Sequence, residues 1–119
     1  QVQKKIKMEL KNEHEKDDLT LDRLDGLTYL DCVLKEVFRF CPAINGTVRT
    51  LNVDDRLPES GTQLYRGDQV LIPFHNLSHD RRYWKFDPEQ FYPERFLHED
   101  KDHPTYALIP FGQGHRQCM

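Results

Sequence analysis

Pro42 divides this sequence into two parts with different hydrophobic patterns. Before it, apolar residues recur at the three- and four-residue spacing of an amphipathic helix; after it, they fall in short runs separated by prolines and glycines. Proline has no backbone N–H and disfavours the helical conformation in the residue before it, so a helix that approaches Pro42 must end there. The pattern predicts an α+β chain, helical in its first third and built of short strands and loops in the remainder.

Two short helices are expected first. Residues 1 to 13 carry apolar side chains four apart among charged ones, which favours an exposed helix with a narrow apolar stripe of Val2, Ile6 and Leu10. Residues 20 to 26 favour a brief helix that Gly26 ends, and Thr28 then stands where the N-cap of the next helix is expected.

The third helix, residues 27 to 40, has the clearest pattern. Its apolar residues recur at the helical spacing: Leu27, Leu30, Leu34, Val37 and Phe38. Glu36 and Arg39 lie side by side on the opposite face, because successive residues of a helix are about 100° apart. An isolated pair of this kind is expected to be a solvated surface ion pair that adds roughly a few tenths of a kcal/mol.

Arg95 changes what is expected of that pair. Three aromatic residues stand close to it in the sequence, Phe91, Tyr92 and Phe96, which favours partial burial of its guanidinium. A buried arginine needs a carboxylate, and Glu36 can bind both Arg39 and Arg95. Such a triad would lock the helix to this segment, and breaking it would cost about 3–5 kcal/mol because a buried charge is left unpaired.

Short β-strands and irregular chain are expected in the remainder. Residues 47 to 51 and 69 to 74 are strand-like, and turn residues separate them: Pro58, Gly61 and Gly67. From Asp80 onward, aromatic residues, prolines and charges are mixed without a period, which predicts an irregular but packed chain. His75 and His79 have a spacing that can bind zinc on a helix, but they follow a predicted strand, so no zinc site is expected.

The composition excludes several classes of protein. The 17 basic and 20 acidic side chains leave a formal net charge of −3, without the basic stripe of a nucleic-acid-binding protein. No apolar run approaches the roughly 20 residues needed to cross a bilayer. The 3 cysteines have an irregular spacing that argues against a disulfide framework, and we expect two of them, Cys32 and Cys41, to be small packing residues.

The third cysteine, Cys118, ends the segment with the strongest chemical signal. Gly112 and Gly114 allow the backbone to turn sharply or to approach a flat ligand closely. Arg116 offers a fixed cation, and Cys118 offers a thiolate. This set suits haem, which requires an axial ligand, cations for its carboxylates and an apolar or aromatic wall, for which Phe111 is suited.

Residues 111 to 118 resemble the cysteine-pocket signature F-x-x-G-x-R-x-C of cytochromes P-450. They follow, in that family's order, an E-x-x-R motif at residues 36 to 39 and a P-E-R-F motif at residues 93 to 96. The segment 67 to 88 is also similar to the family, so the resemblance covers residues 1 to 119. It implies a fragment of the mainly α cytochrome P-450 fold, a partial domain from the C-terminal half of a eukaryotic-type member, truncated at both ends.

The resemblance also implies a role for each motif residue. Cys118 would be the axial thiolate ligand of the haem iron, Arg116 would bind a haem propionate, and Phe111 would pack near the sulfur side of the ring. Gly114 would give the loop its close turn. Arg49 matches the position of a second propionate-binding arginine. The remaining motif residues would be structural rather than catalytic: Glu36, Arg39 and Arg95.

The implied activity is that of the whole protein, a haem-thiolate monooxygenase that inserts one oxygen atom of O2 into a small apolar organic substrate. The resemblance implies haem b as cofactor, electrons from NADPH through a partner reductase, and an N-terminal anchor on the cytoplasmic face of the endoplasmic reticulum membrane. In the family, the helix that handles oxygen would lie before Gln1, and a glycine that follows the cysteine would lie after Met119. We therefore expect this chain alone to bind haem poorly and to oxidise nothing.

Two alternatives stay open at this point. A haem-thiolate isomerase or dehydratase of the same fold would rearrange peroxides without needing oxygen or a reductase, and a truncated product would have no catalytic role. The sequence predicts no individual substrate, although residues 43 to 47 are expected to touch it.

Overall fold

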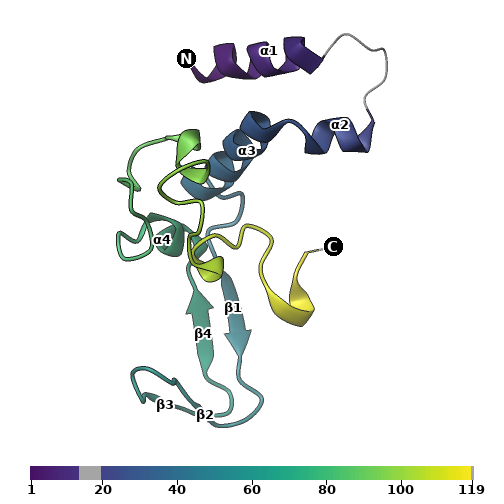
Figure 1. Ribbon diagram of the computed structural model, residues 1–119. Helices are drawn as coiled ribbons and strands as arrows, with labels where there is room; N and C mark the ends of the chain where they lie inside the picture. Colours follow the sequence, from purple (N-terminus) through teal and green to yellow (C-terminus); the bar gives the residue numbers. More distant parts are fainter. Residues whose placement is uncertain (14–19, 119) are drawn as a thin grey trace.

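Three helices fill the first third of the chain, as the hydrophobic pattern predicts (Figure 1). They are α1 (Val2–Glu13), α2 (Leu21–Asp25) and α3 (Thr28–Phe40). The computed structural model describes residues 1–13 and 20–118, and each of these helices begins and ends within one residue of the expected bounds. The prediction of a helical first third is therefore confirmed.

The start of α3 is capped from α1 and not by Thr28. The N-cap position is Leu27, which makes no side-chain cap bond, and Thr28 is already the first helical residue, so the predicted cap was wrong. The Glu9 carboxylate instead accepts hydrogen bonds from the backbone N–H groups of Tyr29 at 2.7 Å and Leu30 at 2.9 Å. A negative charge is favourable at the N-terminus of a helix, so this contact fixes α1 to α3.

Two small antiparallel sheets follow the helices (Figure 1). Strand β1 (Thr47–Thr50) pairs with β4 (Gln69–Ile72), which confirms both predicted strands. Strand β2 (Asp55–Arg56) pairs with β3 (Gln63–Leu64) in the segment that connects β1 to β4, at the end away from the helices (Figure 1). Strands of 2 residues are too short to show a hydrophobic period, so the sequence did not predict this second sheet.

The residues after β4 form a helix where the sequence predicted a continued strand. Helix α4 (Phe74–His79) begins directly after Pro73, which has no N–H to donate to a sheet. The predicted strand through residue 74 was therefore wrong, and so was the geometric reason given against zinc. His75 and His79 stack on one face of α4 with ring centroids 4.3 Å apart. Within the described parts of the chain, no group of three or more His, Cys, Asp or Glu side chains is arranged to hold a metal ion.

The apolar core lies where α3 meets the second half of the chain. Cys32 of α3 packs with three residues from that half, Trp84, Phe96 and Ala107. Cys32 is thus a packing residue, as expected. Cys41 is exposed at the C-cap position of α3, so the same expectation was wrong for it.

The described residues after α4, 80 to 118, are mostly irregular and contain three short 3-10 helices. These are η1 (Pro93–Phe96), η2 (Thr105–Ala107) and η3 (Gly114–Arg116). Helix η1 is attached to both α1 and α3, because the Glu94 carboxylate forms an ion pair with Lys5 of α1 and accepts a hydrogen bond from the Tyr29 hydroxyl of α3 at 3.1 Å. The irregular, packed segment that the mixed composition predicts is therefore present.

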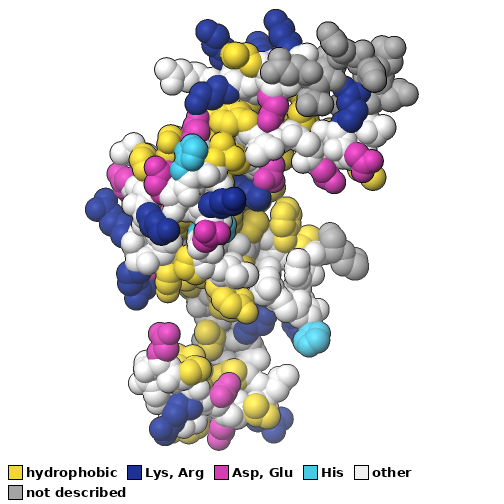
Figure 2. Space-filling view, in the orientation of Figure 1, with side chains coloured by type: hydrophobic (Ala, Val, Ile, Leu, Met, Phe, Trp, Pro, Cys, Tyr) yellow, Lys and Arg dark blue, Asp and Glu magenta, His cyan; other side chains and the backbone are white. Residues whose placement is uncertain are grey.

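The molecule is elongated. It measures 59 × 30 × 21 Å and its Cα radius of gyration is 18.3 Å, whereas a compact domain of this length would have a radius of about 13.5 Å. Apolar side chains reach the surface along much of the face shown in Figure 2; on α3, Leu34 is 50% and Val37 is 42% exposed. Among the described helices, none has the length and apolarity that a bilayer-spanning segment requires.

Candidate functional site

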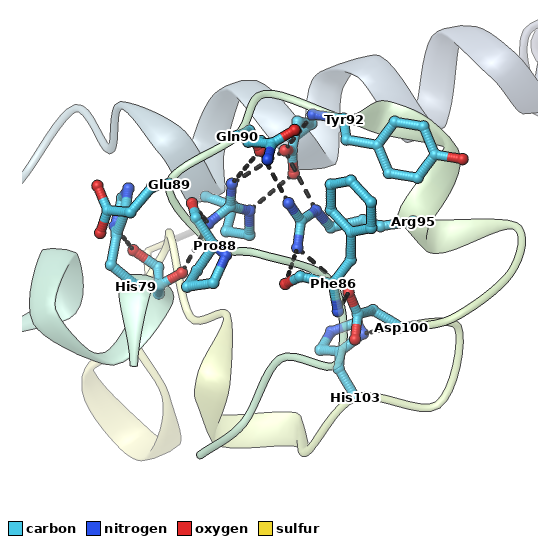
Figure 3. Close-up of polar contacts among 12 residues, drawn as sticks. His79, Phe86, Pro88, Glu89, Gln90, Tyr92, Arg95, Asp100 and His103 are labelled. Carbon is cyan, nitrogen blue, oxygen red and sulfur yellow. Dashed lines mark hydrogen bonds and ion pairs between the residues drawn. The ribbon is translucent and has the colours of Figure 1, made fainter. Parts of the chain in front are cut away.

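A buried ion-pair network joins α3 to the segment around η1 (Figure 3). The side chains of Glu36, Arg39 and Arg95 are each 0% exposed. The two carboxylate oxygens of Glu36 accept hydrogen bonds from Arg39 Nε at 2.7 Å and Nη2 at 2.9 Å. Glu36 Oε1 also accepts a bond from Arg95 Nε at 3.2 Å. The contacts predicted between Glu36, Arg39 and Arg95 are therefore present. The pair of Glu36 and Arg39 is buried and not on the surface, where an isolated pair of this spacing was expected.

The two guanidinium groups hold the chain segment that covers α3. Arg39 donates to the backbone carbonyls of Ser78 and Pro88, both at 2.9 Å. Arg95 donates to the carbonyls of Phe86, Asp87 and Gln90 at 3.1, 2.9 and 2.8 Å. The Ser78 carbonyl lies in the last turn of α4, where a helix leaves carbonyls without a partner, and the others belong to irregular chain outside the helices and strands. The arginines satisfy them, which is why a charged face of α3 can be buried.

Aromatic rings line the same network, although they are not the rings that the sequence predicted. The guanidinium carbon of Arg95 lies 5.2 Å from the ring centre of Phe86 and 5.7 Å from that of Trp84. Trp84 also faces Arg39 at 5.4 Å. The expected neighbour Phe91 is 41% exposed and packs against Phe40 instead. Cation–π contact lowers the cost of burying two like charges close together.

Asp100 is a fourth member of the network, and no sequence pattern predicted it. It is 1% exposed and accepts a bond from Arg95 Nη1 at 3.2 Å. Burial lowers the pKa of Arg95 from its usual value, and the carboxylates of Glu36 and Asp100 oppose that shift. In the sequence Asp100 is one of several acidic residues in a polar stretch, and no period or motif distinguishes it from the others.

A backbone hydrogen bond joins the two ends of the cysteine loop, residues 111 to 118. The backbone N–H of Cys118 donates to the carbonyl of Phe111 at 2.9 Å. Gly112 and Gly114 have φ angles of +74° and +78°, which other residues rarely adopt, so both turns of the loop require glycine. The Phe111 ring meets the Phe38 ring of α3 edge to face with centroids 5.2 Å apart, which attaches the loop to the helix.

Four of the predicted site residues line one hollow of about 350 Å³: Cys118, Phe111, Arg49 and Arg116. Its other lining residues include Ala43 and Ile44 from the loop that follows α3. Arg49 and Arg116 also line a neighbouring polar hollow of about 400 Å³ together with His115. Gly114 belongs to the loop without lining either hollow. The Cys118 thiol and the Phe111 ring thus line the same hollow as Arg49 and Arg116. The two arginines also line the polar hollow beside it.

This set of groups fits haem. A thiolate is a suitable axial ligand for iron, and two arginines suit the two carboxylates of the porphyrin. The apolar side chains beside Cys118 suit the body of the ring. Glu36, Arg39 and Arg95 line neither hollow and belong to the buried ion-pair network.

A family model described as Cytochrome P450 matches residues 1–119. The chain belongs to the cytochrome P450 family. This agrees with the resemblance carried by the three motifs, and it explains why helices, small sheets and irregular chain occur together: they form part of the cytochrome P450 fold.

Individual relatives and a solved structure agree with that assignment. The chain is 37% identical to cytochrome P450 4V2 of Rattus norvegicus over 123 residues, covering 100% of the chain and 23% of the relative. It is 39% identical to cytochrome P450 3A11 of Mus musculus over 101 residues, covering 84% of the chain and 19% of that protein. A retinoic acid bound cyanobacterial CYP120A1 superposes with a TM-score of 0.84 at 31% identity, covering 98% of the chain and 27% of the structure. The chain thus spans about a quarter of the length of the proteins it matches.

Proposed function

We propose that the whole cytochrome P450 to which these residues belong is a haem-thiolate monooxygenase and that Cys118 is its axial iron ligand. The observation that carries this proposal is that Cys118, Phe111 and two arginines, Arg49 and Arg116, line one hollow. On this proposal residues 1–119 are a partial cytochrome P450 domain, and the isolated chain is inactive.

Each residue at the hollow has a role in this proposal. Cys118 binds iron as the thiolate, and Arg49 and Arg116 bind the two haem carboxylates. Phe111, attached to α3 through Phe38, keeps water from the sulfur side of the ring. The bound haem supplies oxygen activation, which a thiolate ligand promotes by pushing electron density towards the iron. Gly114 allows the turn that brings Arg116 and Cys118 to the same hollow.

The remaining parts of the proposal concern the whole protein. Its substrate is a small apolar organic molecule, which the loop at residues 43 to 47 touches; Ala43, Ile44, Gly46 and Thr47 line the hollow beside Cys118. Electrons come from NADPH through a partner reductase, and the protein is held on the cytoplasmic face of the endoplasmic reticulum membrane. The Glu36, Arg39 and Arg95 network is structural, because it binds backbone carbonyls of the segment that covers α3 and does not line the hollow.

A chimaera tests the ligand assignment directly. In the 4V2 chimaera, residues 1–119 replace the matching segment of full-length rat cytochrome P450 4V2. We expect it to incorporate haem and, when reduced under carbon monoxide, to show the Soret band of a thiolate-ligated iron. Cys118→Ala should lose this band, while the matched control Cys41→Ala, at an exposed cysteine outside the hollow, should keep it. A chimaera that folds like its parent without binding haem, or a Cys118→Ala variant that keeps the thiolate band, would overturn the proposal.

A further inference from the structure

The buried network is electrically neutral only when Asp100 is included. Glu36, Arg39 and Arg95 together carry two positive charges and one negative charge, and all three are 0% exposed. Asp100, 1% exposed, adds the second negative charge. An unpaired charge inside a protein is costly, because neither water nor a counter-ion solvates it. The charge balance therefore requires a residue that lies outside the three sequence motifs.

Asp100 connects three separate stretches of backbone (Figure 3). Its carboxylate accepts hydrogen bonds from the N–H groups of Lys85 at 2.7 Å and Phe86 at 3.3 Å, besides the bond from Arg95. Its own N–H donates to the carbonyl of Arg95 at 2.9 Å. Its carbonyl accepts a bond from the backbone N–H of His103 at 3.2 Å and lies 2.9 Å from His103 Nδ1.

Contacts lead from Asp100 to Ala107, four residues before the cysteine loop. The His103 ring, held by the Asp100 carbonyl, stacks on Trp84 with centroids 5.1 Å apart. Trp84 belongs to the core that also buries Ala107. Phe111 lies four residues further along the chain, and its carbonyl accepts the bond from the backbone N–H of Cys118. The segment that leads to the cysteine loop is thus held at Asp100, and the loop itself is held at Phe111 by the Phe38 ring of α3.

We propose that Asp100 is a positioning residue for the haem-thiolate site: by holding Arg95, the backbone of residues 85 and 86, and His103, it sets the place of the segment that carries Cys118. Asp100 does not touch the hollow itself. This inference rests on the proposed function, since it assigns Asp100 to the site at which Cys118 binds haem. Substitutions of residues that orient metal ligands commonly weaken metal binding about 10–100-fold, and an effect of this kind is expected here.

The test compares Asp100→Asn with Asp102→Asn in the 4V2 chimaera. Both substitutions remove one carboxylate charge, but Asp102 is exposed, two residues along the same segment. In the fraction of protein that still contains haem, we expect Asp100→Asn to lower the ratio of thiolate-type to other reduced carbon monoxide complexes about tenfold. Asp102→Asn should leave that ratio unchanged. A residue with a merely structural role would reduce the amount of haem protein and leave the ratio intact.

A double variant keeps the proposal testable if Asp100→Asn folds poorly. Arg95→Gln combined with Asp100→Asn restores a neutral network, so the midpoint of urea denaturation should fall less than the sum of the two single effects. Additive effects, or an Asp100→Asn ratio equal to that of Asp102→Asn, would overturn the role of Asp100 while the unmodified chimaera keeps its thiolate band. Absence of that band from the unmodified chimaera would instead overturn the proposed function.

Discussion

The carboxylate of Glu9 on α1 accepts a hydrogen bond of 2.7 Å from the backbone N–H of Tyr29, in the first turn of α3. Its second oxygen accepts a bond from the next backbone N–H, that of Leu30, at 2.9 Å. Two of the N–H groups that a helix leaves without a partner at its start are thus satisfied by a different helix. The contact replaces a local cap, since Leu27 and Thr28 supply none.

Glu9→Ala should therefore destabilise the protein through the start of α3. Loss of an N-cap acceptor costs about 0.5–2 kcal/mol, and the lost charge at the helix N-terminus contributes to that sum. Urea denaturation of the 4V2 chimaera measures the free energy of unfolding. Glu59→Ala, at an exposed glutamate, is the control, and it should change stability by less than about 0.5 kcal/mol. Equal effects of the two variants would show that Glu9 does not cap α3.

Two ion pairs on α3 allow the effect of burial to be measured on one helix. Glu36 and Arg39 are both 0% exposed, whereas Asp31 and Lys35 form a pair at 2.6 Å whose side chains are 54% and 49% exposed. We expect Arg39→Ala to cost about 3–5 kcal/mol and to prevent haem incorporation, because it leaves the Glu36 carboxylate buried with one cation fewer.

Lys35→Ala is the matched control for that prediction. An exposed pair of this spacing contributes about 0.3–0.5 kcal/mol, and salt screens it. Urea denaturation at low and high salt should show a small, salt-sensitive loss for Lys35→Ala and a large, salt-insensitive loss for Arg39→Ala. A well-folded Arg39→Ala variant that binds haem normally would contradict the structural role of the network.

The first three helices, the two main strands and the pair of Glu36 with Arg39 could be predicted because they depend on spacing along the chain, whereas the contact of Glu36 with Arg95 was expected from the aromatic residues around Arg95 and the family motifs. A helical period identifies residues 27 to 40 whatever packs against them. Spacing alone, however, does not tell which face of a helix is covered. Leu34 and Val37 are exposed and the charged face is buried, because the irregular segment that binds Arg39 happens to cover that side.

The features that sequence reasoning missed depend on contacts between distant residues or on very short elements. Asp100 is buried because the backbone of Lys85 and Phe86 folds back onto it, and nothing local indicates this. Helix α4 has only 6 residues, fewer than two turns, so its pattern merges with that of the preceding strand. The hollow that Arg49 and Cys118 share was expected only through the family motifs, since these residues are far apart in the sequence.

Gly46 is expected to tolerate no side chain. A Cβ atom at this position would lie 2.6 Å from the carbonyl oxygen of Ile72 and 3.1 Å from Cα of Pro73, both backbone atoms. Gly46→Ala should therefore push β1 away from the end of β4 and cost about 1–3 kcal/mol. Gly26→Ala is the control: its Cβ would lie 3.3 Å from the nearest atom at a helical φ of −72°, so its effect should stay within about 1 kcal/mol. Urea denaturation of both variants checks this, and an equal cost would show that β1 and β4 can separate without loss.

Tyr29 should ionise at a higher pH than an ordinary tyrosine. Burial and the hydrogen bond that its hydroxyl donates to the Glu94 carboxylate raise the pKa of Tyr29 to about 12. The folded state therefore keeps this proton at a pH at which the unfolded chain, with a tyrosine pKa of about 10, has lost it. Tyr29 contributes stability that is complete below about pH 10 and is lost as the pH rises towards about 12.

The difference in phenolate absorbance between the unmodified chimaera and Tyr29→Phe isolates the titration of this residue. Glu94→Gln keeps a hydrogen-bond acceptor at the same place but removes the negative charge, so the midpoint of the Tyr29 titration should move down towards pH 10. Tyr106→Phe is the control, because it also removes one phenol from the segment but at a side chain that is 66% exposed. If Tyr29 ionises near pH 10 in the unmodified protein, the bond to Glu94 does not form in solution, and Glu94 then contacts α1 through Lys5 while η1 stays joined to α3 through Arg95 and Glu36.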